Sequence, residues 1–148
     1  MSFSERNEII FGASGIEKLK NSTVAVYGLG GVGAAAAMAL VRSGVGTIKA
    51  VDFDTVSESN LNRLIFGFET NVGMKKSDVF LNAAKSVNPD VNIEVYSDFM
   101  HGTDAASTVL DADFHIDAID SLNPKVNLII ALLESSRNFS LPLLNARI

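Results

Sequence analysis

Four glycines within six residues, Gly28, Gly30, Gly31 and Gly33, have a spacing that indicates chemistry. They follow a β-branched and aromatic run, 23–27, and precede small residues that predict a helix over 34–41. In a strand–turn–helix unit the first glycine permits the turn, the second lets the backbone approach phosphate, and the last lets the helix pack on the strand. The loop amides and the helix N-terminus then form an anion site. The alternative is a glycine-rich turn that serves only helix packing.

Two carboxylates follow the next predicted strand, residues 47–51. Asp52 comes directly after it, 24 residues beyond Gly28, where a nucleotide-binding unit places the acid that holds the ribose. A turn-forming aspartate is the alternative for Asp52. Asp54 either stays near the same pocket or caps the next turn.

Cationic and amide side chains come next in the chain. Asn60 and Arg63 are three residues apart, which places them on one face of a helical turn. Lys75 and Lys76 open a predicted helix over 74–87, where the helix dipole disfavours cations. Two lysines at this place indicate a nearby anion, with solvated surface lysines as the alternative.

A further carboxylate, Asp120, ends the predicted strand over 114–119 and therefore lies on the edge where parallel sheets bind ligands. With Arg63 and Lys76 able to reach the same edge, the set holds two cations and an extra acid around a phosphate cradle. NAD needs only the cradle and the ribose acid. ATP with Mg²⁺ carries more charge and needs an oxygen ligand for the metal, so the set favours ATP over NAD.

The elements that must position these residues alternate between strand and helix. This order predicts an α/β, Rossmann-like, doubly wound, mainly parallel sheet with helices on both faces. A two-piece helix broken at Gly12 is expected over 3–20, a short one from Thr103, another from Pro124 to about Ser136, and a fifth strand from Leu141.

Composition narrows the class of protein. The 148 residues fit one domain, 47% hydrophobic, and contain no cysteine, which excludes a thiol nucleophile or thiolate metal site within them. A net charge of −5 does not indicate a general nucleic-acid surface. No apolar stretch is long enough to cross a bilayer and the N-terminus is polar, so we expect a cytoplasmic protein without membrane contact.

The motifs, in order, resemble the ubiquitin-activating-enzyme superfamily, which includes the ThiF and MoeB adenylyltransferases. They are Gly28-x-Gly-Gly-x-Gly33, Asp52-x-Asp54, Asn60-x-x-Arg63, Val72-Gly-x-x-Lys76 and Asp117-Ala-Ile-Asp120. The opening Ser4-x-Arg6-Asn-Glu and the run Ile116 to Lys125 are most similar to the tRNA threonylcarbamoyladenosine dehydratase subgroup.

This resemblance implies roles for single residues. The four glycines would shape the phosphate loop, Asp52 would hold the ribose, and Asn60, Arg63 and Lys76 would contact the triphosphate. Asp54 is expected among the cofactor-binding residues. Asp120 would hold Mg²⁺. Arg6 would reach the ATP of a partner subunit, which implies a homodimer. The residues taken as catalytic are Arg63, Lys76, Asp120 and Arg6.

The implied activity is ATP-dependent adenylation of a carboxylate. The acceptor would be tRNA carrying threonylcarbamoyladenosine, whose modified base is then cyclised, or the C-terminus of a small ubiquitin-like or sulfur-carrier protein. A nucleotide-binding module without turnover is the third alternative. Family members continue past the fifth strand, so we expect residues 1–148 to be an ATP-binding adenylation domain that lacks the C-terminal part of the family fold.

Overall fold

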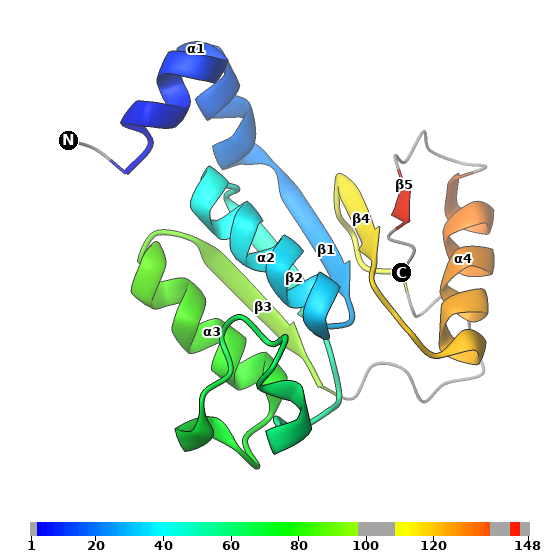
Figure 1. Ribbon diagram of the computed structural model, residues 1–148. Coiled ribbons are helices and arrows are strands. Elements are labelled where there is room, and N and C mark those ends of the chain that lie inside the picture. The colour runs from blue at the N-terminus through cyan, green and yellow to red at the C-terminus, as the bar shows by residue number, and fades with distance from the viewer. Residues whose placement is uncertain (1–2, 98–108, 137–142, 146–148) are drawn as a thin grey trace.

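The computed structural model describes residues 3–97, 109–136 and 143–145. Its centre is a parallel sheet of five strands in the order β3-β2-β1-β4-β5 (Figure 1). All neighbouring strands are parallel, and the chain adds β2 and β3 on one side of β1 and β4 and β5 on the other, which is the doubly wound arrangement that the sequence predicts. The strands are β1 Thr23–Tyr27, β2 Thr47–Val51, β3 Asn92–Tyr96, β4 Phe114–Asp117 and β5 Leu143–Asn145.

Helices cover both faces of this sheet, as predicted. In Figure 1, α2 and α3 lie side by side over β1, β2 and β3, whereas α4 lies beyond β4 and β5. The helices are α1 Glu5–Asn21, α2 Gly31–Ser43, α3 Lys76–Val87 and α4 Leu122–Ser136, and two short 3₁₀ turns are η1 Glu58–Asn60 and η2 Glu69–Asn71.

Side-chain alternation along β1 divides the core between the two faces. Val24 and Val26 pack with α2 and α3, whereas Ala25 and Tyr27 pack with Leu128 of α4 and its neighbours. A strand buried on both faces reads as a continuous apolar run, which explains the sequence of β1. Packing on both faces holds β1 in place and thereby positions the glycine loop that follows it.

The N-terminal helix is interrupted where the sequence predicts. Gly12 has φ 68 and ψ 169, which are not helical, and two helical pieces meet there. The Thr103 helix predicted from sequence falls mainly on residues 98–108, outside the described residues. No helix within the described ranges is long and apolar enough to cross a membrane.

Candidate functional site

The glycine loop connects β1, which lies between β2 and β4 in the sheet, to α2. Gly28 has φ 91, a left-handed value that favours glycine, and its N–H donates to the Val51 carbonyl at 2.8 Å. A Cβ on Gly28 would lie 2.7 Å from the Ala118 carbonyl oxygen, and one on Gly33 only 1.8 Å from the Gly28 carbonyl oxygen. The loop therefore folds closely on itself, and α2 starts beside it with first-turn N–H groups that have no partner in the helix.

Asp52 is fixed by two backbone amides at the end of β2. Its Oδ2 accepts from Leu29 N at 2.6 Å and its Oδ1 accepts from Asp54 N at 2.8 Å. The residue is 7% exposed. Burial raises the pKa of the Asp52 carboxyl, while the Leu29 amide and the Lys76 ammonium act in the opposite direction. The remaining lone pairs of the Asp52 carboxylate can accept hydrogen bonds from the hydroxyl groups of a ribose.

Asp54, shortly after the end of β2, forms an ion pair with Lys76 of α3. Its Oδ2 is 2.8 Å from Lys76 Nζ, and its carbonyl accepts from the Lys76 N–H at 3.0 Å. The Lys76 side chain is 8% exposed and that of Asp54 is 57% exposed. Lys75, by contrast, donates to the Ser97 hydroxyl at 3.1 Å. Of the two lysines that open α3, Lys76 is the one that lines the pocket.

Asn60 and Arg63 come from the segment after β2, and Arg63 approaches the glycine loop. The Arg63 guanidinium donates to the Ser59 carbonyl at 2.8 Å, and its aliphatic stem passes 3.2 Å from the place of a Cβ on Gly31. Asn60 Oδ1 accepts from the Ser57 N–H at 3.3 Å, so this amide also closes its own turn. Both residues line a pocket that also includes the start of α2.

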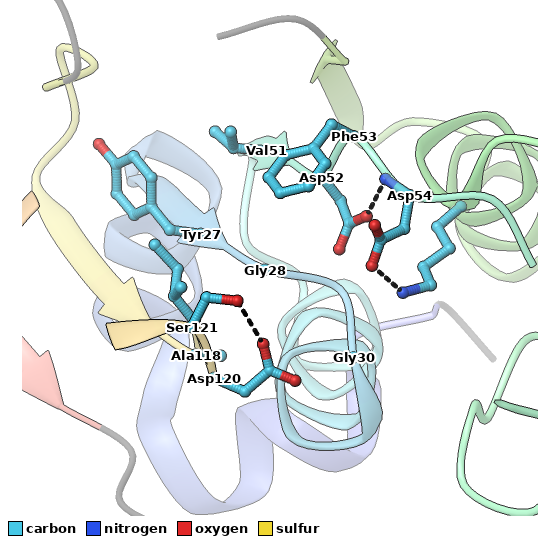
Figure 2. A pocket seen from close by; sticks show the side chains of 12 residues that line it. Tyr27, Gly28, Gly30, Val51, Asp52, Phe53, Asp54, Ala118, Asp120 and Ser121 are labelled. Carbon is cyan, nitrogen blue, oxygen red and sulfur yellow. Dashed lines mark hydrogen bonds and ion pairs between the residues drawn. The ribbon is translucent and has the colours of Figure 1, made fainter. Parts of the chain in front are cut away.

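Two adjoining pockets collect these residues. One, of about 110 Å³, is lined by Asp52, Phe53 and the glycine loop, and the other, of about 590 Å³, by Asn60, Arg63 and the start of α2. Figure 2 shows the first pocket, with Asp52 and Asp54 on one side and Asp120 on the other. The two pockets share five residues: Gly30, Asp54, Lys76, Ala118 and Asp120. Together they form one continuous site.

Asp120 faces the site from the β4 side (Figure 2). Its Oδ1 accepts from the Ser121 hydroxyl at 3.4 Å, which leaves most of the carboxylate available. Within the described part of the chain no three metal-ligating side chains gather. Asp120 lies beside the predicted phosphate loop, and its carboxylate fits Mg²⁺, which proteins bind through one or two carboxylates, substrate phosphates and water.

Arg6 is not part of this arrangement within one chain. Neighbouring Asn7 donates to the Arg42 carbonyl at 3.2 Å, at the end of α2 opposite the loop. Because α2 has 13 residues and each rises 1.5 Å, the end of α2 that Asn7 contacts lies about 20 Å from the glycine loop.

The structure adds one charged pair that the sequence reasoning did not use. Asp117 is 0% exposed, and its Oδ2 lies 3.0 Å from Lys125 Nζ. Both residues belong to sequence runs quoted in the sequence analysis. A carboxylate inside a predicted buried strand is the signal that could have indicated a buried ion pair.

The other addition is a buried aromatic pair beside the site. Tyr27 stacks on His115 with ring centroids 6.0 Å apart, and its hydroxyl accepts from the Leu110 N–H at 3.0 Å. Burial raises the pKa of Tyr27 to about 12, so the ring stays neutral. His115 is packed within its strand, at 1% exposure.

Comparison with known proteins gives a consistent result. The ThiF family model matches residues 4–144. The tRNA threonylcarbamoyladenosine dehydratase of Bacillus subtilis is 41% identical over 125 residues, 83% of this chain and 49% of that protein. The molybdopterin-synthase adenylyltransferase of Escherichia coli is 35% identical over 112 residues, 76% of this chain and 45% of that protein.

Solved structures agree on the fold. The E. coli tRNA N6-threonylcarbamoyladenosine dehydratase TcdA in complex with ATP superposes with a TM-score of 0.85 at 32% identity, over 95% of this chain and 57% of that one. The chain thus spans about half the length of the relatives that it matches.

Proposed function

The chain belongs to the ThiF family, and from that premise we propose that it binds ATP and activates a carboxylate by adenylation. One observation carries the proposal. Arg63, Lys76 and Asp120, from three separate segments, line one pocket with the start of α2. A dinucleotide site has no need of this collection of charges, whereas a triphosphate with a metal ion does.

The pocket suggests how ATP would lie. The ribose hydroxyls would bind Asp52, whose carboxylate is held by two amides. The phosphates would follow the loop to the first turn of α2, where free N–H groups bind anions. Asn60, Arg63 and Lys76 would contact the triphosphate from the opposite wall, with Asp54 holding Lys76 in the pocket. Asp120 would hold Mg²⁺, which neutralises charge on the phosphate oxygens.

The chemistry demands little proton transfer from the protein. An acceptor carboxylate is ionised at neutral pH, and its oxygen attacks the α-phosphorus of ATP. The bond from that phosphorus to the bridging oxygen breaks, and pyrophosphate leaves with the electron pair. Arg63, Lys76 and the loop amides would stabilise the charge that develops on the phosphoryl oxygens.

For the acceptor we propose tRNA that carries threonylcarbamoyladenosine. The threonyl carboxylate would form an acyl-adenylate, which closes to a ring through a neighbouring nitrogen as AMP leaves. The similarity to the dehydratase of B. subtilis supports this assignment. The similarity to the molybdopterin-synthase adenylyltransferase favours a second candidate, in which the acceptor is the C-terminus of a small ubiquitin-like or sulfur-carrier protein.

Two measurements test the proposal. Titration calorimetry with ATP and Mg²⁺, and with NAD as the comparison, tests the binding site, and preferential binding of NAD would refute it. Release of AMP is then measured with threonylcarbamoyladenosine-containing tRNA, with unmodified tRNA, and with a carrier protein that ends in Gly-Gly. Release only with the modified tRNA supports the first candidate, and release only with the carrier protein supports the second. ATP binding without AMP release under any condition would indicate a nucleotide-binding module without turnover.

We also propose that the protein acts as a homodimer. Arg6 lies far from the site of its own chain, and α1 exposes Ile9 at 82% and Ile10 at 75% to solvent. Burial of these side chains against a second copy would bring an N-terminal arginine toward a second site. Light scattering after size exclusion measures the mass, and a monomer at micromolar concentration would contradict the proposal.

A further inference from the structure

We propose that Lys125 is a positioning residue, which holds the segment 118–121 and thereby sets the place of Asp120 in the nucleotide pocket. The expected effect on ATP binding rests on the proposed function, whereas the contacts of Lys125 do not depend on it. Lys125 lies in the first turns of α4 and does not line either pocket.

Two contacts tie the segment to Lys125 and Asp117, and a third joins these two side chains. Asp117 Oδ1 accepts from the Ile119 N–H at 3.1 Å. The Lys125 ammonium donates to the Ile119 carbonyl at 3.1 Å and lies 3.0 Å from Asp117 Oδ2. Both backbone groups of Ile119 are therefore held by one ion pair, at the residue directly before Asp120.

The same segment supports the glycine loop. The Ala118 N–H donates to the Tyr27 carbonyl at 2.9 Å, and the Ala118 carbonyl oxygen would lie 2.7 Å from a Cβ on Gly28. Asp120 itself has one hydrogen-bond partner within the described part of the chain, the Ser121 hydroxyl at 3.4 Å. The direction of the Asp120 carboxylate therefore depends on the backbone that Lys125 holds.

Lys125 is also the counter-charge of a buried carboxylate. Asp117 is 0% exposed, and its Oδ2 has no hydrogen-bond partner in the described ranges, so the Lys125 ammonium 3.0 Å away is its charge partner there. A buried charge that loses its partner draws in water or moves toward solvent. Removal of the ammonium alone would thus displace the end of β4 and the segment after it. An arginine at this position would keep the charge and donate to the same carbonyl.

A double-mutant cycle tests this role on the full chain. Lys125→Met and Asp120→Asn are each expected to weaken binding of ATP with Mg²⁺ by about tenfold, since loss of an outer partner of a metal ligand costs 10–100-fold. The double variant should bind no more than twofold more weakly than Asp120→Asn, because Lys125 acts through Asp120. Lys125→Arg should retain affinity within threefold. Multiplication of the two single effects, or no rescue by arginine, would overturn the proposal.

Amide hydrogen exchange gives a second readout that does not depend on nucleotide. In Lys125→Met the amides of Ala118 and Ile119 should exchange at least tenfold faster than in the parent protein. The matched control is Lys85→Met, because Lys85 also joins a helix to backbone carbonyls, including that of Pro89 at 3.2 Å, but lies outside both pockets. Unchanged exchange in Lys125→Met, or equal acceleration in Lys85→Met, would overturn the inference.

The two proposals fail separately. If the parent protein binds no ATP, the proposed function fails, and hydrogen exchange alone decides whether Lys125 holds the segment. If Lys125→Met does not fold, Asp117→Asn/Lys125→Met takes its place, because no buried charge then lacks a partner. It should show the same accelerated exchange at Ile119, and protection equal to that of the parent would refute the role.

Discussion

Gly33→Ala is the sharpest test of the loop geometry. A Cβ at Gly33 would lie 1.8 Å from the Gly28 carbonyl oxygen and 2.9 Å from its carbonyl carbon. Real Cβ contacts essentially never fall below 3.0 Å, so the backbone at Gly28 must move by about 1.2 Å or more. The displaced atom belongs to the loop itself, and a rotamer change of another side chain cannot relieve the contact.

The expected loss of ATP affinity follows from this displacement of the loop backbone. A misplacement of about 1 Å in a positioned site costs about 100-fold, which corresponds to about 2.7 kcal/mol of binding free energy. We therefore expect Gly33→Ala to weaken ATP binding by about 100-fold. Forcing an extra methyl group into packed structure costs about 1–3 kcal/mol in the free energy of unfolding, or about 3–10 °C in melting temperature for a chain of this size.

A second glycine separates the local effect from the loss of stability. A Cβ on Gly46 would lie 1.7 Å from the Lys20 carbonyl oxygen, at the opposite end of the sheet from the loop. Gly46→Ala should therefore lower the melting temperature by a similar amount and leave ATP affinity unchanged. Calorimetric titration with ATP and thermal unfolding of both variants provide the comparison. Affinity within threefold of the parent in Gly33→Ala, or an equal loss in Gly46→Ala, would refute the reasoning.

Other predictions follow from charges in and beside the site. Arg63→Ala and Asp120→Ala should each abolish adenylation in a full-length protein and keep the circular dichroism spectrum; unchanged AMP release would remove either residue from the catalytic set. Lys76→Met should weaken ATP binding by about 100-fold, and adding Asp54→Asn should recover about tenfold, because it removes the carboxylate left without its cation 2.8 Å away; calorimetry without recovery would contradict this. Burial lowers the pKa of His115 below 6.5, so the unfolded chain binds a proton first as pH falls and the free energy of unfolding decreases by up to about 1.4 kcal/mol per pH unit. His115→Phe should flatten this slope between pH 6.5 and the lowered folded pKa in urea titrations, and equal slopes would contradict the assignment.

The fold was predictable because its signals are local. The β-branched run of β1, the glycines after it and the small residues of α2 occupy consecutive positions, and the helical periods of α3 and α4 are equally continuous. Alternation of strands and helices then leaves few topologies. The arrival of Asp52 and Asp120 at one edge follows from the parallel direction of β2 and β4 alone. The structure confirms these elements and their order along the chain.

Side-chain partners could not be predicted in the same way. Lys76 pairs with Asp54, which is 22 residues earlier, through a crossover whose path the sequence leaves open. The sequence indicated an anion near Lys76, and the described structure supplies one from the protein itself. Asn60 caps Ser57 as well as facing the pocket, and only the local turn geometry reveals this second role. Such pairings depend on distances of a few tenths of an ångström, which residue types and spacings do not determine.

The charge balance of the site connects the proposed ATP, the proposed Mg²⁺ ion and the proposed homodimer. Its described walls carry two cations, Arg63 and Lys76, against three carboxylates, Asp52, Asp54 and Asp120. A triphosphate that enters such a pocket meets no net positive charge, and the loop amides supply only partial charges. The proposed binding of ATP would therefore need further positive charge, and the proposed Mg²⁺ ion at Asp120 would supply part of it. Arg6 of a second copy, in the proposed homodimer, would be another source of positive charge. The proposed metal ion and the proposed dimer would then meet the same electrostatic requirement.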